Sequence, residues 1–158
     1  MLENTTFPCI KAIYHGPNYF IEQKILENQF KIEHWFRKKW QQIQPPIYCS
    51  VDLRNSGFKI SPIDTNLFPA GFNNIHPDLK PLCVQVIQST FEQRFPNCTK
   101  VVIIPENHTR NEFYFESIGF LQEALQMAGY EVVIGSIMPE LETSRDIDLP
   151  SGKKITLH

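Results

Sequence analysis

Two short apolar segments, separated by one segment of helical length, constrain the fold of this chain more than any other feature. Residues 100–104 read Lys-Val-Val-Ile-Ile, and residues 131–135 read Glu-Val-Val-Ile-Gly. Residues 112–128 carry apolar side chains at helical spacing, and Gly129 is typical of the position that follows a helix. A strand, a helix and a strand in this order predict a βαβ unit with parallel strands and a right-handed crossover. The chain is therefore predicted to be an α/β protein, with its first parallel strand buried on both faces.

The segment 17–44 is the clearest helix in the sequence. Its apolar side chains recur at near-helical spacing, Pro17 suits a first helical turn, and Pro45 begins a Pro-Pro pair that stops the pattern. The opposite side carries Glu and Lys residues, as a solvated face does. Trp35 and Trp40 could stack on a ligand, but aromatic side chains on an amphipathic helix more often pack in a core. We interpret both as core residues.

A β-hairpin and a second helix are predicted to follow. Residues 47–53 and 58–64 predict two strands joined by an Asn-Ser-Gly turn, in which Gly57 can supply a positive φ. Residues 77–94 predict the helix. His76, directly before it, either contacts a ligand or takes part in capping.

The last part of the sequence predicts two more short strands. They lie within residues 146–158 and flank a Pro-Ser-Gly turn. With only two strands in the βαβ unit, residues 131–135 are expected to form an open sheet edge. Such an edge lowers stability or promotes self-association.

The composition bounds the class of protein. The chain has 158 residues, of which 42% are hydrophobic and 20% charged, as in a soluble globular domain. A net charge of −2 offers no basic surface for nucleic acid or an anionic membrane, and no apolar run approaches the roughly 18 residues of a membrane span. The sequence starts with neither the basic nor the apolar region of a signal peptide, so we expect a cytoplasmic protein. Its four cysteines lack zinc-site spacing, so we expect reduced thiols and no metal site.

Residues 50–74 concentrate charged and amide side chains between Gly and Pro residues. Opposite charges that alternate along paired strands suit a zwitterionic ligand, whereas an ordinary solvated hairpin and loop account for the same pattern. Two of the acids, Asp52 and Asp64, are expected to face each other across the hairpin. They can be paired acids or metal ligands, or they can pair with Arg54 and Lys59. The charged and amide residues of the segment are Asp52, Arg54, Asn55, Lys59, Asp64, Asn66, Asn73 and Asn74.

A second polar segment, residues 105–111, lies between the first parallel strand and its helix. Ligands of open α/β sheets bind at the carboxyl ends of strands, where the amino termini of helices offer free N–H groups. Arg110 adds a forked donor for carboxylate or phosphate, and His108 can carry a proton or donate a hydrogen bond. The alternative is structural: Thr109 or Asn111 caps the helix, and Arg110 pairs with a nearby glutamate. Neither G-x-G-x-x-G nor G-x-x-x-x-G-K-[ST] occurs in the sequence.

Two blocks of the sequence, residues 50–74 and residues 101–114, closely resemble the signature blocks of bacterial glutamate–cysteine ligases of the ATP-grasp-related type. The resemblance covers most of positions 10–138. Members of that family run much longer, so the chain resembles their amino-terminal portion, in truncated form. By resemblance, residues 1–98 form a helical and hairpin substrate-binding region. Residues 99–158 begin a Rossmann-like βαβ domain of the pre-ATP-grasp type, and the two are expected to pack as one compact unit.

The resemblance implies ATP-dependent joining of L-glutamate to L-cysteine, a carbon–nitrogen ligation that begins glutathione biosynthesis. It implies ATP and Mg²⁺ as cofactors of the full-length enzyme, with neither expected on this chain alone and no metal ligand assigned. Arg54 and Arg110 are expected to bind carboxylates or the acyl phosphate in catalysis, and Asp64 to bind an ammonium group. The remaining substrate-binding residues are expected to be Asp52, Asn55, Lys59, Asn66, Asn73, Asn74, His108 and Asn111.

Two other functions stay open at this point. The chain can be an amino-acid-binding remnant without catalysis, or a subunit completed by a separate ATP-binding chain. A homo-oligomer is a further possibility. In every case the hairpin and the loop after it are expected to converge with residues 105–111 in one pocket. Arg54 or Lys59 should then lie within roughly 10 Å of Arg110 or His108.

Overall fold

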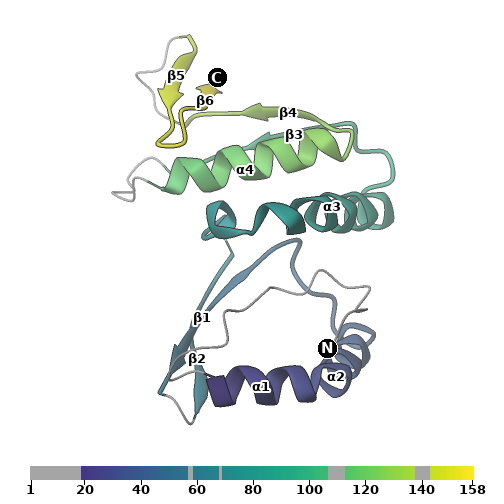
Figure 1. Ribbon diagram of the computed structural model, residues 1–158. Coiled ribbons are helices and arrows are strands. Elements are labelled where there is room, and N and C mark those ends of the chain that lie inside the picture. The colour runs from purple at the N-terminus through teal and green to yellow at the C-terminus, as the bar shows by residue number, and fades with distance from the viewer. Residues whose placement is uncertain (1–18, 57–58, 68, 107–112, 138–142) are drawn as a thin grey trace. The chain divides into compact units, whose positions relative to one another are not determined.

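The computed structural model describes residues 19–56, 59–67, 69–106, 113–137 and 143–158, which form two compact units (Figure 1). Unit 1 is Met1–Phe68 and unit 2 is Pro69–His158. The boundary that we expected at 98/99 falls inside unit 2, and the chain divides into two compact bodies where we expected one. The reason is that the helix before residue 98 packs on the helix of the βαβ unit.

Unit 1 begins with two helices, α1 (Tyr19–Glu27) and α2 (Gln29–Trp40), where we predicted a single helix over 17–44. They are interrupted at Asn28, whose backbone has φ −107° and ψ 11°. The Asn28 side chain donates from Nδ2 to the backbone oxygen of Lys24 at 2.8 Å. Asparagine competes in this way for backbone groups that a continuous helix would use, so this single residue ends α1.

The predicted hairpin is confirmed as β1 (Ser50–Asn55) and β2 (Ile60–Asn66), which pair in antiparallel fashion. Asp52 pairs with Asp64, but the next pair is Leu53 with Pro62, so Ile63 has no partner in the ladder. This is a β-bulge. It adjoins Pro62, which has no N–H to donate to a regular ladder, and bulges are where strands accommodate proline.

The described residues of unit 1 form no buried core. None of the residues described in 20–56 and 59–67 is buried, and Trp35 and Trp40 are both more than half exposed. The interpretation of these tryptophans as core residues is therefore wrong for the described structure. A pair of short helices and a two-stranded ribbon provide no second layer against which the apolar stripe of the helices can be buried.

Unit 2 confirms the predicted βαβ unit. Its sheet has the strand order β3-β4-β6-β5, in which β3 and β4 run parallel, β4 and β6 run parallel, and β5 and β6 run antiparallel. The predicted strands of the tail are β5 and β6. The elements of unit 2 are η1 (Phe72–Asn74), η2 (Pro77–Leu79), α3 (Lys80–Arg94), β3 (Lys100–Ile103), α4 (Tyr114–Met127), β4 (Glu131–Ile134), β5 (Arg145–Asp148) and β6 (Lys154–Leu157).

Helix α4 forms the middle layer of unit 2. Figure 1 shows α4 lying between the sheet and α3, and it contacts both α3 and β4. The core lies here, and its best-buried apolar side chains include Ile118, Leu125, Ile134 and Leu157. Because the described helices cover one face of the sheet, β3 is buried only at Ile103. Val102 and Ile104 are more than half exposed, so the prediction that β3 is buried on both faces is wrong.

Strand β4 lies inside the sheet, which corrects the prediction of an open edge at 131–135. It pairs with β3 along its length and with β6 at Ile134 and Leu157. The backbone N–H of His158 donates to the oxygen of Ile134 at 2.8 Å. The strands of the tail therefore satisfy the edge that the two-strand prediction left unpaired, and β3 and β5 become the outer strands.

The end of α4 agrees with the sequence prediction. Gly129 has a φ of +97°, and its N–H donates to the oxygen of Gln126 at 3.0 Å. The N–H of Tyr130 donates to the oxygen of Leu125 at 3.1 Å, which completes a Schellman motif. Separately, no helix in the described part of the chain is long and apolar enough to cross a membrane.

A charge network fastens the turn of the β5–β6 hairpin and the start of α3 to α4. Glu123 of α4 accepts hydrogen bonds from Lys80 and from Lys153, the latter at 2.9 Å. These two bonds, Lys80 first, hold the pKa of Glu123 below its ordinary value of 4.5. The Lys80 Nζ atom also lies 5.7 Å from the ring centre of Phe120. One carboxylate thus connects three segments of unit 2.

We predict that Glu123→Gln lowers stability at neutral pH and that the loss disappears in acid. A lowered folded-state pKa means that the carboxylate stabilises the fold above the unfolded value and stops doing so as the pH falls through the folded value. Since the side chain is more than a third exposed, we expect a loss below about 1 kcal/mol. Urea unfolding at pH 7 and at a series of lower pH values measures it. Glu92→Gln, which removes the charge of an α3 carboxylate that accepts a hydrogen bond from Gln88, is the matched control. Equal unfolding free energies of wild type and Glu123→Gln at pH 7 would contradict the role of the network.

Candidate functional site

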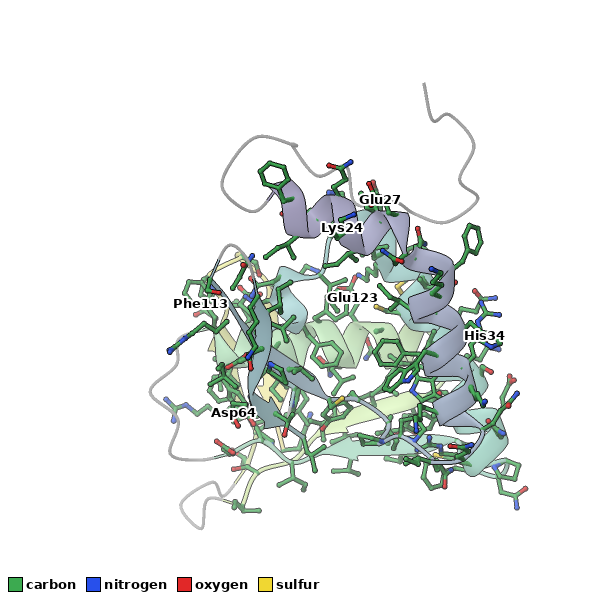
Figure 2. All side chains as sticks on the ribbon, turned by 90° about the horizontal axis from the view of Figure 1, so that it is seen from below. Lys24, Glu27, His34, Asp64, Phe113 and Glu123 are labelled. Carbon is green, nitrogen blue, oxygen red and sulfur yellow. The ribbon has the colours of Figure 1, made fainter. Side chains whose placement is uncertain are left out.

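The hairpin of unit 1 carries a polar face. Residues opposite each other in an antiparallel pair, and alternate residues along a strand, share one face. Asp52 pairs with Asp64 as predicted, and Arg54 pairs with Ser61. Asp64 is labelled on this hairpin in Figure 2. By this register, the residues of the polar face are Ser50, Asp52, Arg54, Ser61, Asp64 and Asn66.

The charges of this face are not paired with one another. Among the described residues, no ion pair joins Asp52 or Asp64 to Arg54 or Lys59. The Asp52 and Asp64 carboxylates, which the strand register places opposite each other, therefore have no counter-charge from the hairpin. Two such carboxylates repel each other unless a cation is near. The described residues also contain no group of three or more His, Cys, Asp or Glu side chains that could hold a metal. Ion pairs within the hairpin, one of the alternatives open from the sequence, are thus not formed among the described residues.

Two of the predicted residues of the hairpin lie away from its polar face. Asn55 pairs with Ile60 on the opposite face. Lys59 belongs to the turn, where its backbone oxygen accepts from the Ser56 N–H at 3.0 Å and from the Ser56 hydroxyl at 3.1 Å. One residue that sequence reasoning did not single out belongs to the face instead. The hydroxyl oxygen of Ser50 is enclosed and has no hydrogen-bond partner among the described residues.

In unit 2, Asn73 is fixed by the start of α4. The Ser117 hydroxyl donates to Asn73 Oδ1 at 2.9 Å, and Ser117 is only 2% exposed. Asn73 in turn donates from Nδ2 to Asn74 Oδ1 at 3.3 Å. The ring of Phe72 lies 6.0 Å from that of Phe120, and Gly71 supplies the left-handed conformation that starts this turn, with φ 76°. Asn73 therefore anchors its loop to α4, a role that the sequence did not indicate.

The beginning of the second polar segment is held by the same end of α4. The backbone N–H of Glu106 donates to the hydroxyl of Tyr114 at 2.9 Å. Tyr114 is buried, and burial raises the pKa of its hydroxyl. Residues 71–74 and Glu106 thus meet at the amino-terminal end of α4, which follows the carboxyl end of β3. This is the edge at which parallel sheets bind ligands.

The turn between β5 and β6 reaches this end of the helix as well. Glu116, in the first turn of α4, accepts hydrogen bonds from the Ser151 backbone N–H and from the Ser151 hydroxyl, the latter at 3.0 Å. Sequence reasoning missed Tyr114, Glu116 and Ser117 as anchors. The only available signal was their position in the first turn of a predicted helix, where one face can contact several loops.

Some predictions lie outside the described residues. His108, Arg110 and Asn111 are among them, and so the expected approach of these side chains to Arg54 or Lys59 stays a prediction. His76 is described, and its Nδ1 accepts from the Asp78 N–H at 3.3 Å. This is a cap on η2, which favours the capping alternative over a ligand contact.

Comparison with known proteins decides the family. A family model described as glutamate–cysteine ligase matches residues 22–158. This chain belongs to the glutamate–cysteine ligase family. The resemblance of residues 50–74 and 101–114 is thereby confirmed.

A solved structure supports the assignment. The chain is similar to a protein of Methylobacillus flagellatus KT assigned as a gamma-glutamylcysteine synthetase, with 45% sequence identity and a TM-score of 0.75. The match covers 98% of this chain and 36% of that chain, so this chain spans about a third of the length of its ligase-family relative. Among curated proteins, none matches.

We predict that Asn73→Ala destabilises unit 2 of this ligase-family chain. The substitution leaves the buried hydroxyl of Ser117 without its acceptor, and an unsatisfied buried polar group costs about 1–3 kcal/mol. Urea unfolding measures the loss. Asn74→Ala, at an exposed neighbouring position, should change stability by less than about 0.5 kcal/mol. In a double-mutant cycle, Ser117→Ala and Asn73→Ala should be non-additive, and additive losses would show that the bond contributes nothing.

Proposed function

We propose that this chain supplies the amino-acid-binding part of a glutamate–cysteine ligase, corresponding to the amino-terminal portion of the enzyme. The reaction joins the γ-carboxyl group of L-glutamate to the amine of L-cysteine with ATP. The family match carries this proposal, and the polar face of the hairpin and the polar residues near the start of α4 are compatible with it. The finer assignments to an ATP-grasp-related enzyme, to a Rossmann-like layer and to the cytoplasm belong to the same proposal.

The polar face of the hairpin suits one end of a zwitterion. Asp52 and Asp64 face each other, and neither forms an ion pair with a described lysine or arginine, so an ammonium group placed between them would relieve their repulsion. Arg54 follows on the same face two residues along β1, about 6.6 Å away at the backbone. Its guanidinium can hold a carboxylate through two parallel hydrogen bonds. Ser50 and Asn66, paired at the end of this face, are further candidates to orient the substrate.

The start of α4 suits the anionic end of the reaction. The amino terminus of a helix favours negative charge, because the helix dipole is positive there. We assign Arg110 to a carboxylate or the acyl phosphate, and His108 and Asn111 to substrate orientation. Asn74 has the same role in the neighbouring loop, whereas Asn73 acts by holding that loop in place. Asn55 and Lys59 remain candidates on the far face and turn of the hairpin.

The chemistry needs positioning and charge neutralisation more than any special nucleophile. An oxygen of the γ-carboxylate attacks the terminal phosphorus of ATP and displaces ADP, which gives an acyl phosphate. The cysteine amine then attacks the acyl carbon, displaces phosphate and loses a proton. Arginine side chains lower the energy of the charge that develops on the transferred group. ATP and Mg²⁺ are expected for the full-length enzyme. The described residues offer no cluster of metal ligands, so none is assigned to the ion.

A second candidate function is a subunit or remnant that binds the amino acid while another chain binds ATP. The observation that favours it is the share of the relative that is matched, 36% of that chain. Binding of glutamate without turnover, followed by turnover when an ATP-binding chain is added, would distinguish a subunit from a remnant. A remnant binds glutamate and gains nothing from the addition.

We predict that Arg54→Ala weakens the binding of glutamate about tenfold to a hundredfold. The substitution removes charge-assisted hydrogen bonds worth roughly 1.5–3 kcal/mol. Isothermal titration calorimetry measures the affinity. Arg37→Ala is the matched control, since Arg37 is an exposed arginine of α2 in the same unit, 3.8 Å from Glu33. Unchanged glutamate affinity in Arg54→Ala, with a normal circular dichroism spectrum, would count against the assignment.

We also predict that the 158-residue chain alone shows no ATP hydrolysis that depends on glutamate and cysteine. The described residues bring together no set of metal ligands, and phosphoryl transfer relies on groups that hold the triphosphate in line with the attacking oxygen. A coupled assay of ADP release, with the two amino acids added together and separately, measures it. Turnover by a pure monomeric preparation would show that this chain contains the whole ligase site.

A further inference from the structure

Helix α2 exposes a cluster of aromatic side chains. Trp35, Phe36 and Trp40 are 55%, 43% and 57% exposed. Their rings nevertheless contact one another: the centroids of Trp35 and Phe36 are 5.1 Å apart, and those of Phe36 and Trp40 are 5.7 Å apart. Exposed apolar clusters of this kind mark surfaces that bind another macromolecule.

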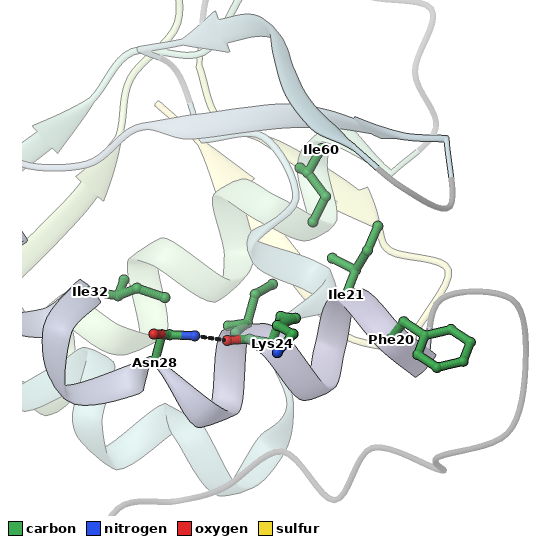
Figure 3. A pocket seen from close by; sticks show the side chains of 7 residues that line it. Phe20, Ile21, Lys24, Asn28, Ile32 and Ile60 are labelled. Atoms are coloured by element: carbon green, nitrogen blue, oxygen red, sulfur yellow. Dashed lines mark hydrogen bonds between the residues drawn. The ribbon is translucent and has the colours of Figure 1, made fainter.

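The cluster continues into an apolar groove on the same helix pair. Figure 3 shows the groove, which has a volume of about 660 Å³. Ile32 lines it, and Phe36 and Trp40 follow Ile32 at successive intervals of four residues, which places all three along one stripe of α2. The groove and the aromatic cluster together are called the α1–α2 surface below. The residues that line the groove are Phe20, Ile21, Lys24, Ile25, Asn28, Ile32 and Ile60.

Burial of the α1–α2 surface against further protein would stabilise unit 1. Folding of a small unit is stabilised by apolar area removed from water, and that gain only slightly exceeds the entropy lost on ordering the chain. None of the residues described in 20–56 and 59–67 is buried, so the described part of unit 1 gains little of this stabilisation. The two helices are amphipathic, as helices that face a core are, but their apolar side is not buried by the described residues.

The structural relative indicates which polypeptide packs on the α1–α2 surface. It shares the fold over 98% of this chain, yet the match accounts for only 36% of its own length. We propose that the α1–α2 surface is the docking surface for the part of a ligase-family polypeptide that this chain does not span. This inference rests on the family membership of the chain and does not depend on the proposed reaction or on any substrate-binding residue.

The charges of α2 indicate which charges the segment that docks on this surface carries. Arg37, Lys38 and Lys39 follow one another at the end of the helix, and Lys39 lies 5.6 Å from the ring centre of Trp35. Glu33, 3.8 Å from Arg37, is the nearest counter-charge recorded on the helix. The segment that docks is therefore apolar along its contact stripe and carries carboxylates at its rim, opposite Lys38 and Lys39.

The two tryptophans provide the readout. They are the only two in the sequence and both lie in α2, so intrinsic tryptophan fluorescence of this chain reports on the α1–α2 surface alone. The 158-residue chain is produced alone, and also together with a tagged polypeptide that corresponds to the unmatched part of the Methylobacillus flagellatus relative. Tryptophans in that partner are replaced by phenylalanine. Light scattering gives the mass of each species, and acrylamide quenching gives the accessibility of the indoles.

We expect the chain alone to be quenched readily and the two polypeptides to purify as a complex with quenching reduced at least threefold. Failure of the two to purify together overturns the proposal. A complex in which acrylamide still quenches the tryptophans as readily as in the chain alone also overturns it. So does protection of the tryptophans from acrylamide in the chain alone, whether by self-association or within the monomer.

Variants distinguish docking at the α1–α2 surface from nonspecific hydrophobic association. Phe36→Glu should weaken the complex at least tenfold while both tryptophans remain as reporters, and Met127→Glu, at an exposed apolar residue of unit 2, should leave it unchanged. Lys38→Glu changes charge without removing apolar area, and it should weaken the complex at low salt more than at high salt. Binding by Phe36→Glu as tight as wild type, or equal weakening by Met127→Glu, overturns the proposal. Glutamate affinity of the same preparations is measured by calorimetry, so loss of docking and loss of ligand binding are distinguished.

Discussion

Burial of α4 between the sheet and α3 is the interaction on which the rest of unit 2 depends. Ile118, Ala124 and Leu125 are almost fully enclosed there, and the removal of such apolar area from water is the dominant favourable term in folding. The same helix then positions three segments that are remote in sequence. Its first turns hold Asn73 through Ser117, Glu106 through Tyr114, and the β5–β6 turn through Glu116. A well-packed helix thus supplies a rigid frame for loops that carry polar side chains.

The two units use their apolar residues in different ways. In unit 2 they are enclosed by neighbouring elements of the same unit, as at Ile134 and Leu157. In unit 1 they remain on the surface of the helix pair, whereas the charged residues collect on one face of the hairpin. Unit 1 thus presents an apolar surface and a polar face on different elements, whereas unit 2 encloses many of its apolar side chains.

Local patterns predicted the elements well, because each pattern has a local cause. The apolar runs of β3 and β4 and the glycine after α4 are sufficient to specify a parallel pair and its helix. The pairing of Asp52 with Asp64 followed from the turn that joins their strands. The break at Asn28 was missed, since the apolar spacing continues across it and only the side-chain bond to Lys24 interrupts the helix. Burial of Trp35 was mispredicted because a pattern shows which face is apolar, but not whether anything covers it. Long-range anchors such as Ser117 to Asn73 have no local signature at all.

The β-bulge at Ile63 has a consequence for how β2 relates to the rest of unit 1. Ile60 and Asp64 are four residues apart and would lie in the same phase of a regular strand. The extra residue between them shifts the phase, so Ile60 lines the apolar groove while Asp64 shares a face with Asp52 and Arg54. Deletion of one residue here would keep a hairpin that still pairs, but it would turn an isoleucine toward the charged residues or an aspartate toward the groove. Insertions and deletions at this position are therefore far more disruptive than substitutions, although the position lies on the surface.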